Sequence, residues 1–194
     1  PIASFGDFSA LSFFADKTIT TGEGGMLLTD KAELINESNI YKHDGRRERG
    51  VDVIERRGFN FRLTELQAAI GVAQIKKSNR FVQRKKENYE MYRSLLIHEK
   101  EVRVFEFNKL GDIVPHRNII FVSKAAELVS YLVENGVGAR TLFMPMHSQP
   151  CYGRTENFPI TEELFETGLC LPSAPSLKRS EIEYICKLIK EFFN

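Results

Sequence analysis

Residues 12–25 read SFFADKTITTGEGG, and this stretch decides which fold the surrounding sequence can adopt. Residues 4–14, which run into it, are aromatic and apolar with small polar interruptions, a pattern that predicts a half-buried strand. The closing glycines tolerate positive φ, so a sharp reversal costs little there, and residues 26–29 predict a second short strand. The stretch therefore predicts a hairpin whose connecting turn carries Lys17.

The residues after the hairpin predict a helix and then a cationic loop. Residues 30–43 have the pattern of a helix, with Asp30 as its N-cap. The buried side of this helix is expected to consist of Leu34, Ile35 and Ile40. Residues 42–62 carry seven Lys and Arg side chains among few apolar ones, which predicts a long, positively charged loop.

A long helix is expected to follow this loop. Thr64 and Gln67 have the spacing of a capping box, in which each side chain bonds to the backbone N–H of the other residue. Apolar residues then recur at helical spacing up to about residue 96. We predict one continuous helix over this range, and a division into two domains at residues 1–80 and 81–194.

The last hundred residues predict a smaller α/β unit. Short apolar runs there predict strands, and Asn135-Gly136 is typical of a helix C-terminus. The expected strands or extended segments lie at 119–122, 137–143 and 170–172, and the expected helices lie at 124–134, 161–168 and 180–193.

The composition is that of an ordinary folded protein. Of the 194 residues, 42% are hydrophobic and 27% are charged, which argues against intrinsic disorder. No apolar run approaches the ~18 residues that a spanning helix needs, and no charged-then-apolar signal segment opens the chain. A formal net charge of +1 favours neither nucleic acid nor a membrane as partner. No C-x-x-C pair occurs, so we expect a cytoplasmic protein with reduced thiols at Cys151, Cys170 and Cys186.

Lys17 is the first candidate for chemistry. It follows two phenylalanines, and a lysine in apolar surroundings is poorly solvated when charged, which favours the neutral amine that attacks carbonyl groups. Ser12 lies five residues earlier, where its hydroxyl could bind a phosphate while Lys17 reaches an aldehyde of the same cofactor. A surface lysine and an exposed strand serine fit the same positions, so position alone assigns neither role.

Asn60 and the arginines around it form a second candidate region. Asn60 stands just before a predicted helix N-terminus, where unpaired N–H groups favour anions such as phosphate. The arginines of residues 46–62 could bind a diphosphate as bidentate forks. The alternatives are a turn asparagine, and a solvated loop or a set of subunit salt bridges.

His147 lies in a proline-bounded loop over residues 144–152, where it could line a site as a hydrogen-bonding or acid–base group. A packed loop histidine is the alternative. The other histidines are too far apart in sequence to predict a metal cluster. The sequence contains no G-x-S-x-G, P-loop or G-x-G-x-x-G motif, so hydrolase and nucleotide-triphosphatase activities lose their usual support.

Seven segments, in order and spread over nearly the whole chain, together match one pattern. They are SFGD at 4–7, SFFADK at 12–17, TTGEGG at 20–25, HDG at 43–45, GFNFRLTELQAAIG at 58–71, GAR at 138–140 and HSQP at 147–150. The pattern closely resembles the DegT/DnrJ/EryC1/StrS family, the sugar-nucleotide aminotransferases that use pyridoxal phosphate (PLP). The lysine segment and the GFNFRLTELQ segment are highly specific when they occur together.

The resemblance implies roles for the matching residues. Lys17 would form the covalent link to PLP and shuttle the proton during transamination. Family members that carry histidine at this position dehydrate their substrate instead, so the lysine implies amino transfer. Ser12 would bind the PLP phosphate. Asn60 would reach that phosphate from the neighbouring subunit, which implies a homodimer with composite sites. No metal is implied, and the residues expected near the substrate are Arg62, Arg140 and His147.

The implied fold is α/β, the C-terminal portion of a fold-type I PLP aminotransferase: the end of the large domain, a long connecting helix and a small α/β domain. The implied reaction moves an amino group, expected from glutamate, to a keto carbon of a nucleotide-linked sugar in amino-sugar and polysaccharide biosynthesis. Family members begin well upstream of Pro1, so we expect the C-terminal half of such an enzyme. The alternative is a non-catalytic regulatory or assembly fragment of the same family. Neither nucleic acid nor a membrane is an expected partner.

Overall fold

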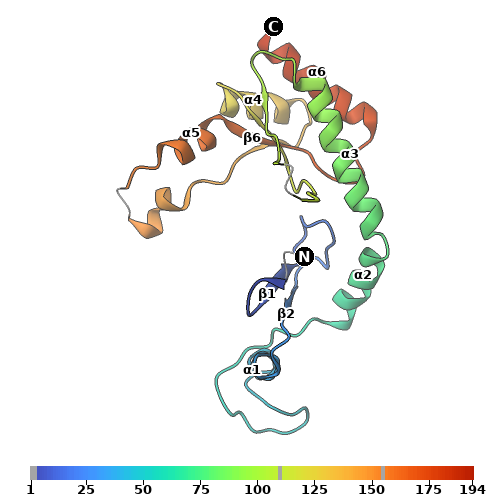
Figure 1. Cartoon of the computed structure of the whole chain (residues 1–194), viewed down its shortest axis with the longest axis vertical. Helices are drawn as coiled ribbons and strands as arrows, with labels where there is room; N and C mark the ends of the chain where they lie inside the picture. Colours follow the sequence, from blue (N-terminus) through green and yellow to red (C-terminus); the bar gives the residue numbers. More distant parts are fainter. Residues whose placement is uncertain (1–3, 109–110, 154–155) are drawn as a thin grey trace. The chain divides into compact units, whose positions relative to one another are not determined.

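The computed structural model describes residues 4–108, 111–153 and 156–194, and the chain divides into two compact units. The first unit is Pro1–Asn79 and the second is Arg80–Asn194. Figure 1 shows both units, with labels on the helices and on some of the strands. All strand pairings in the described residues are antiparallel.

The predicted hairpin is present in the first unit. Its strands are β1 (Ser9–Ser12) and β2 (Gly25–Leu28), paired so that Ser12 faces Gly25. The first strand is much shorter than the predicted 4–14. The Asp7 carbonyl accepts a hydrogen bond from the Thr29 hydroxyl (2.7 Å), which ties the preceding segment to the end of β2 instead of extending the ladder.

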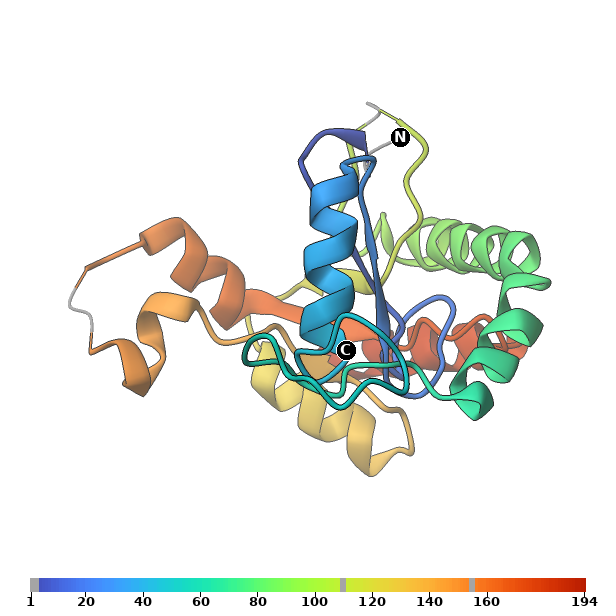
Figure 2. The same cartoon turned by 90° about the horizontal axis from the view of Figure 1, so that it is seen from below.

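The helix predicted over 30–43 is α1 (Ala32–Lys42), which Figure 2 shows lengthwise in blue beside the long loop that follows it. Asp30 is not its cap: Lys31 holds the N-cap position, and its N–H donates to the Thr29 hydroxyl (3.2 Å). The predicted buried side is also reduced, because only Ile40 of its three members is buried. After Lys42, which ends α1, the loop predicted over 42–62 contains no helix or strand apart from one isolated bridge.

The long helix predicted from Thr64 is two helices, α2 (Glu65–Ile75) and α3 (Ser78–Leu96), so the prediction of one continuous helix is wrong. The capping box is confirmed, since the Thr64 hydroxyl accepts from the Gln67 N–H (3.2 Å) and the Gln67 side chain accepts from the Thr64 N–H (3.0 Å). At the break, the Lys77 N–H donates to the carbonyl of Gln74, three residues back, in a tighter turn than an α-helix allows. Neither proline nor glycine marks this break, so the sequence carries no local signal for it.

The second unit contains a four-stranded sheet in the order β3-β4-β6-β5. The predicted strand at 137–143 shortens to two residues, because the Ala139 N–H bonds back to the Val137 carbonyl (2.8 Å). The two-residue β3 was not predicted. The strands are β3 (Arg103–Val104), β4 (Asn118–Phe121), β5 (Arg140–Thr141) and β6 (Gly168–Leu171).

The helices of the second unit bury one face of this sheet. The predicted helices are present within one or two residues of their expected bounds, as α4 (Ala125–Glu134), α5 (Pro159–Thr167) and α6 (Arg179–Phe193). The loop that carries His147 forms two short 3-10 turns, η2 (Met146–Ser148) and η3 (Pro150–Tyr152). Gly136 ends α4 with a φ of 77°, as its position after Asn135 predicts. The core consists mainly of Tyr92, Leu96, Ile120, Leu128, Leu132, Leu169, Ile182 and Ile189.

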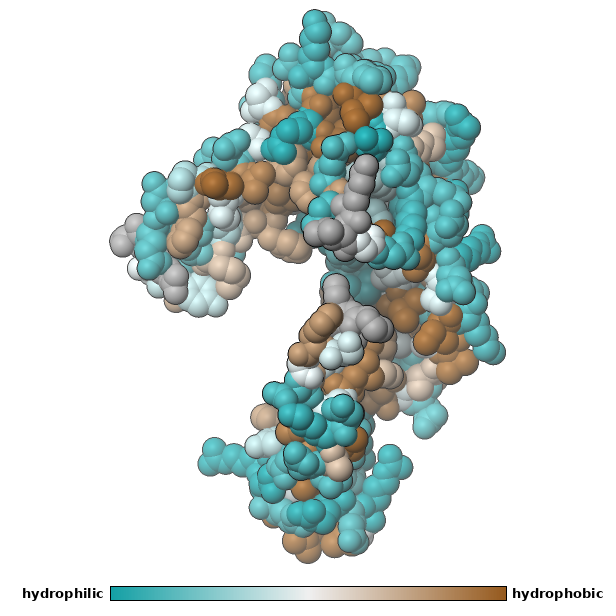
Figure 3. All heavy atoms as spheres, viewed as in Figure 1, coloured by the Kyte–Doolittle hydropathy of each residue, from teal (hydrophilic) through white to brown (hydrophobic). Residues whose placement is uncertain are grey.

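The first unit has far less interior. Ile40, 2% exposed, is its one fully buried large apolar side chain among the described residues. Leu66 of α2 and Phe61 of the loop are 80% and 72% exposed. Figure 3 shows such apolar side chains, in brown, at the molecular surface. The first unit thus presents as surface the kind of residue that the second unit buries.

The reactivity of the three cysteines reports on the packing of the second unit. All three are free thiols; Cys170 and Cys186 are buried and Cys151 is exposed. Burial raises the pKa of Cys186 to about 12 and also raises the pKa of Cys170. Because the thiolate is the nucleophile, both buried thiols are expected to be unreactive near neutral pH.

We therefore expect iodoacetamide at pH 8 to modify Cys151 alone in the native protein and all three cysteines in urea, as measured by intact mass. A Cys151→Ser variant, which should take up no label when folded, is the control. Since the unfolded thiol ionises near its ordinary pKa of 9.0, the contribution of Cys186 to stability is complete below pH 9 and is lost as pH rises toward 12. Equal labelling rates at Cys151 and Cys186 would contradict this packing.

Candidate functional site

Lys17 lies in the turn that connects the two strands of the hairpin. Its backbone N–H donates to the Phe14 carbonyl (3.0 Å), which closes a tight turn just before it. The side-chain Nζ lies 3.3 Å from Asp16 Oδ1, and 36% of the side chain is exposed. Among the described residues of the first unit, the amine thus lies at the surface and is paired with a carboxylate. These residues do not provide the apolar surroundings that the sequence predicts for Lys17.

Ser12 is placed at the same end of the hairpin. It is the last residue of β1, and its Oγ accepts a hydrogen bond from the Phe14 N–H (3.3 Å). Phe14 therefore bonds to Ser12 through its N–H and to Lys17 through its carbonyl. The two residues that the sequence predicts to act together are joined through this one residue.

Two threonines set the shape of the turn. The Thr20 hydroxyl donates to the Phe13 carbonyl (3.0 Å), and the Thr21 N–H donates to the same oxygen (3.0 Å). Buried Thr21 also donates its hydroxyl to the Glu23 carbonyl (2.5 Å), to which Gln67 of α2 donates as well (3.1 Å). The turn is thus tied to the first turn of α2. No role for these threonines was predicted from the sequence, although hydroxyl-to-backbone bonds are typical of threonine in turns.

Asn60 lies exposed in the loop before α2. It forms the isolated bridge with His43, and its Oδ1 accepts a hydrogen bond from Arg62 Nε (3.0 Å). The flanking Phe59 and Phe61 rings stack with centroids 4.9 Å apart. The loop therefore presents Asn60 and Arg62 as a bonded pair, at a position held by backbone pairing to the end of α1.

Two glycines allow this loop to cross itself at close range. Gly45 has a φ of 77°, and a Cβ there would lie 1.8 Å from the Arg56 carbonyl oxygen. A Cβ on Gly58 would lie 2.1 Å from the Gly45 nitrogen. The Glu55 N–H donates to the Gly45 carbonyl (3.0 Å) at the same crossing. The sequence motifs that contain these glycines indicated the region, but not that the two face each other.

The arginines of this loop are largely paired with acidic side chains of the same unit. Arg47 binds Glu55 with both ends of its fork, at 2.9 and 2.8 Å, and the guanidinium lowers the pKa of that carboxyl. Since their guanidinium groups are engaged with carboxylates of the same chain, these arginines are less available as diphosphate forks, and the pairs are not the subunit salt bridges of the alternative prediction. The pairs are Arg46 with Asp52, Arg47 with Glu55, Arg56 with Glu37 and Arg62 with Asp44.

The remaining two predicted residues lie in the second unit. Arg140 is exposed on β5, and its guanidinium carbon lies 4.4 Å from the centroid of the Phe143 ring. His147 is held more tightly, with Nε2 3.0 Å from Glu162 Oε1 and its ring 4.7 Å from the Phe158 ring. The Phe158 N–H donates to the same carboxylate oxygen (3.2 Å). His147 thus has the contacts of a packed loop histidine.

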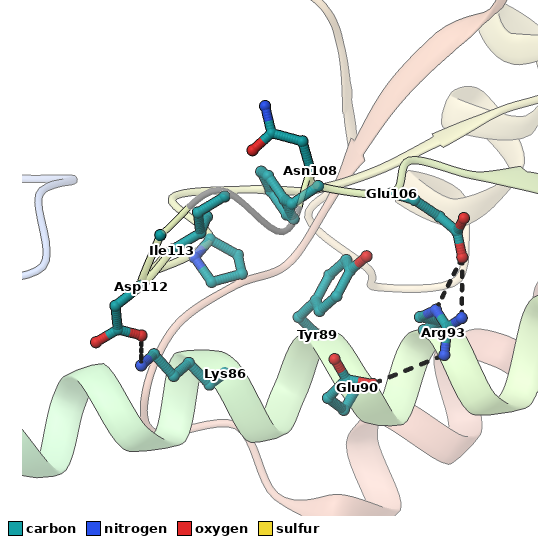
Figure 4. Close-up of a pocket in the computed structure, with 11 residues that line it drawn as sticks. Lys86, Tyr89, Glu90, Arg93, Glu106, Asn108, Asp112 and Ile113 are labelled. Atoms are coloured by element: carbon teal, nitrogen blue, oxygen red, sulfur yellow. Dashed lines mark hydrogen bonds and ion pairs between the residues drawn. The ribbon is translucent and has the colours of Figure 1, made fainter.

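A surface hollow of about 710 Å³ lies between α3 and the segment that precedes β4, and Figure 4 shows its side chains. None of the six predicted site residues lines it. Its charges mostly neutralise each other, since Lys86 pairs with Asp112 and Arg93 binds Glu106 (2.9 Å). Within the described ranges, no group of three or more His, Cys, Asp and Glu residues could hold a metal ion. No described helix is long and apolar enough to cross a membrane.

Comparison with known proteins shows which family the sequence matches. A model of the DegT/DnrJ/EryC1/StrS aminotransferase family matches residues 1–190. Over 202 aligned residues, the chain is 35% identical to GDP-perosamine synthase from Escherichia coli O157:H7. That alignment covers 100% of this chain and 54% of the relative, so the chain spans about half the length of the curated relatives that it matches.

Solved structures share the fold at lower identity. PseC from Helicobacter pylori, an aminotransferase involved in the biosynthesis of pseudoaminic acid, superposes with a TM-score of 0.89 at 23% identity, covering 97% of this chain and 54% of that one. Spr1654 from Streptococcus pneumoniae in its PLP form gives 0.89 at 23% identity over 98% and 53%. The chain has the α/β fold of about one half of these proteins, which confirms the predicted fold class.

Proposed function

The chain belongs to the DegT/DnrJ/EryC1/StrS aminotransferase family, and we propose that it carries part of the site for PLP-dependent amino transfer to a nucleotide-linked keto-sugar. PLP is the cofactor of this family. The observation that supports the proposal most directly is the turn that joins Ser12 and Lys17 through Phe14. The Ser12 hydroxyl, which can bind a phosphate, and the Lys17 amine, which can react with an aldehyde, therefore lie at the same end of the hairpin.

The residues of the turn fit PLP in their chemistry. Ser12 offers a hydroxyl that can donate to a phosphate oxygen, and Asn60 offers an amide that can do the same. Lys17 is the amine that would bind the cofactor covalently. When bound, PLP supplies an electron sink for negative charge at the reacting carbon. Lys17 Nζ would then hold the proton taken from that carbon and return it on the other side of the transfer.

The substrate and donor belong to the same proposal. A nucleotide-linked keto-sugar is supported by the similarity to GDP-perosamine synthase, and an amino-acid donor, expected to be glutamate, by the resemblance of the lysine segment to the family. A cytoplasmic location is supported by the three free thiols, because reducing compartments keep cysteines unpaired. The complete reaction is assigned to the whole protein that contains this sequence.

An amino-transfer assay tests the function. The complete protein is incubated with PLP, glutamate and a nucleotide-linked keto-sugar, and 2-oxoglutarate and the aminated sugar are both measured. We expect the two products in equal amounts. A protein that neither binds PLP nor forms 2-oxoglutarate with any of several keto-sugars would instead be the regulatory or assembly fragment that the sequence left as the alternative.

The proposal includes a homodimer with composite sites. It is supported by the surface of the first unit, where α2 exposes Leu66, Ile70, Val72 and Ile75. Apolar side chains in such number along one helix are typical of a surface that another chain covers. Asn60 lies exposed just before this helix. In the proposed dimer it would reach the cofactor of the partner subunit.

Mixing two variants, assayed at a PLP concentration that does not saturate Asn60→Asp, tests the composite site. Asn60→Asp places a negative charge where the phosphate would bind, and we expect the affinity for PLP to fall roughly 100-fold through repulsion and the lost donor bond. When equal amounts of the Asn60→Asp and Lys17→Ala proteins are dissociated reversibly and mixed, the mixture should recover about a quarter of wild-type activity. About half of the dimers are then hybrids, and each hybrid has one of its two sites free of both changes. Asn36→Asp, on the exposed face of α1, is the control and should stay active. No recovery in the mixture would mean that Lys17 and Asn60 of the same chain serve one site.

A further inference from the structure

The turn that carries Lys17 packs closely against the first half of α2. A Cβ on Gly24 would lie 2.8 Å from Leu63 Cδ1, just before the helix. A Cβ on Gly71, inside the helix, would lie 3.1 Å from the Cγ2 of buried Thr21. The glycines thus permit a close approach at two places, one on the turn and one on the helix.

Gln67, half-buried between these two places on α2, uses both ends of its side-chain amide. The oxygen accepts from the Thr64 N–H (3.0 Å) and from the Thr64 hydroxyl (3.0 Å), so the capping box fixes which way the amide faces. The Nε2 group at the other end donates to the Glu23 carbonyl (3.1 Å), 44 residues away along the chain. Because the two bonds use different atoms, a substitution can remove the donor and keep the acceptor.

A short series of hydrogen bonds connects the Glu23 carbonyl with Lys17. The Thr21 hydroxyl donates to this carbonyl (2.5 Å), and the Thr21 N–H donates to the Phe13 carbonyl (3.0 Å). The carbonyl of Phe14, the next residue, accepts the Lys17 N–H (3.0 Å). A donor that fixes the Glu23 carbonyl therefore restrains the backbone on both sides of the lysine.

Packing within the first unit contributes little to holding this turn. Seven of the eight residues in the two strands of the hairpin are exposed and the eighth is half-buried. A two-stranded hairpin is marginally stable by itself, so the position of its turn depends on bonds to neighbouring elements. A reacting side chain has to be held within about 0.5 Å of its productive geometry by the residues around it. The bond from α2 is placed to do this for the turn.

We propose that Gln67 is a positioning residue for Lys17, whose amide donor holds the lysine-bearing turn against α2 while its amide oxygen caps the same helix. The inference rests on the proposed function, because it names a residue that sets the geometry of the site where PLP would bind. Its action on Lys17 is indirect, through the Glu23 carbonyl and Thr21. Without this donor the turn gains freedom to move away from the helix.

Gln67→Glu in the complete protein tests this role. Glutamate accepts the Thr64 N–H as glutamine does, so the variant keeps the capping box and loses only the donor. We expect an unchanged unfolding midpoint and a roughly 10-fold rise in the dissociation constant for PLP, as loss of a hydrogen bond to the turn predicts. The fraction of bound PLP that borohydride traps on Lys17 should also fall.

Gln67→Met controls for the charge that glutamate introduces. It is neutral and lacks both the donor and the acceptor, so it should weaken PLP binding equally and also lower the unfolding midpoint. Wild-type affinity for PLP in Gln67→Met would show that the loss in Gln67→Glu comes from charge, and it would overturn the proposal.

Thr64→Ala is the matched control for the helix cap. It removes the hydroxyl that accepts the Gln67 N–H, but it leaves the donor to Glu23 in place. We expect a lower unfolding midpoint with unchanged PLP affinity and unchanged trapping on Lys17. If Thr64→Ala weakened PLP binding as much as Gln67→Glu does, binding would follow the stability of α2, and Gln67 would have no positioning role.

Amide hydrogen exchange, measured in the absence of PLP, separates this inference from the proposed function. We expect residues 13–24 to exchange faster in Gln67→Glu than in the wild type or in Thr64→Ala. If the wild type took up no PLP, the proposed function would be refuted, while faster exchange in Gln67→Glu would still show that this side chain holds the turn. If the wild type bound PLP and Gln67→Glu changed neither the exchange nor the trapping on Lys17, the role of Gln67 alone would be refuted.

Discussion

Replacement of Lys17 by alanine in the complete protein is expected to abolish amino transfer, with a loss of about 10³-fold or more, because covalent binding and proton transfer both depend on this amine. The fold should tolerate the change. Lys17 is partly exposed, and its ion pair with the adjacent Asp16 lies at the surface and contributes little to stability. Loss of activity with an unchanged unfolding midpoint would therefore identify a chemical role.

Borohydride trapping gives the same prediction a direct readout. After incubation with PLP and reduction, peptide mapping of the wild type should find the cofactor on Lys17 well above the background at other lysines. The alanine variant should lose this label. Lys187→Ala, on the exposed side of α6, is the matched control and should keep both the label and the activity. Retained turnover in Lys17→Ala would reject the assignment of this lysine.

The second large effect is expected on stability, from Gly45→Ala. The new methyl group would stand 1.8 Å from the Arg56 carbonyl oxygen, and alanine at a φ of 77° is strained even in open space. Relief of the overlap requires the loop to open, which breaks the bond from the Glu55 N–H to the Gly45 carbonyl. We expect a loss of about 3–5 kcal/mol in the free energy of unfolding, measured by urea denaturation of the complete protein.

Gly50→Ala separates backbone strain from steric overlap. Gly50 has a φ of 81°, close to that of Gly45, but nothing lies within 4 Å of a Cβ placed on it. Its replacement should therefore show the strain alone, about 1 kcal/mol. A similar loss for both variants would show that the close crossing does not exist in solution. PLP affinity should fall with Gly45→Ala, since the same crossing holds the loop that carries Asn60.

The local features of the first unit were predictable because they are local. The glycine-rich turn, the Thr64–Gln67 capping box and the cationic loop each depend on residues within a few positions of one another. For the same reason the terminal helix and the helix ending at Asn135-Gly136 were predicted nearly in full. The family resemblance also came from short segments, and the match over residues 1–190 confirms it.

The errors arose where a distant contact decides the outcome. The first strand was predicted too long because its start is tied to Thr29, beyond the turn. The wrong cap at Asp30 is a local error instead, because the Thr29 hydroxyl, two residues away, accepts the N–H of the N-cap Lys31. The break between α2 and α3 has no local signal, since ordinary helix-forming residues occupy it.

The sequence by itself determined the family, the hairpin with its lysine turn and the residues to be tested there, because these are encoded in contiguous motifs. Only the tertiary structure decided what each guanidinium group contacts. Arg56 meets Glu37 from 19 residues away, whereas Arg140 lies over the ring of Phe143. The charge of a guanidinium is set by its residue type, but its partner is set by which backbone segments the fold brings together.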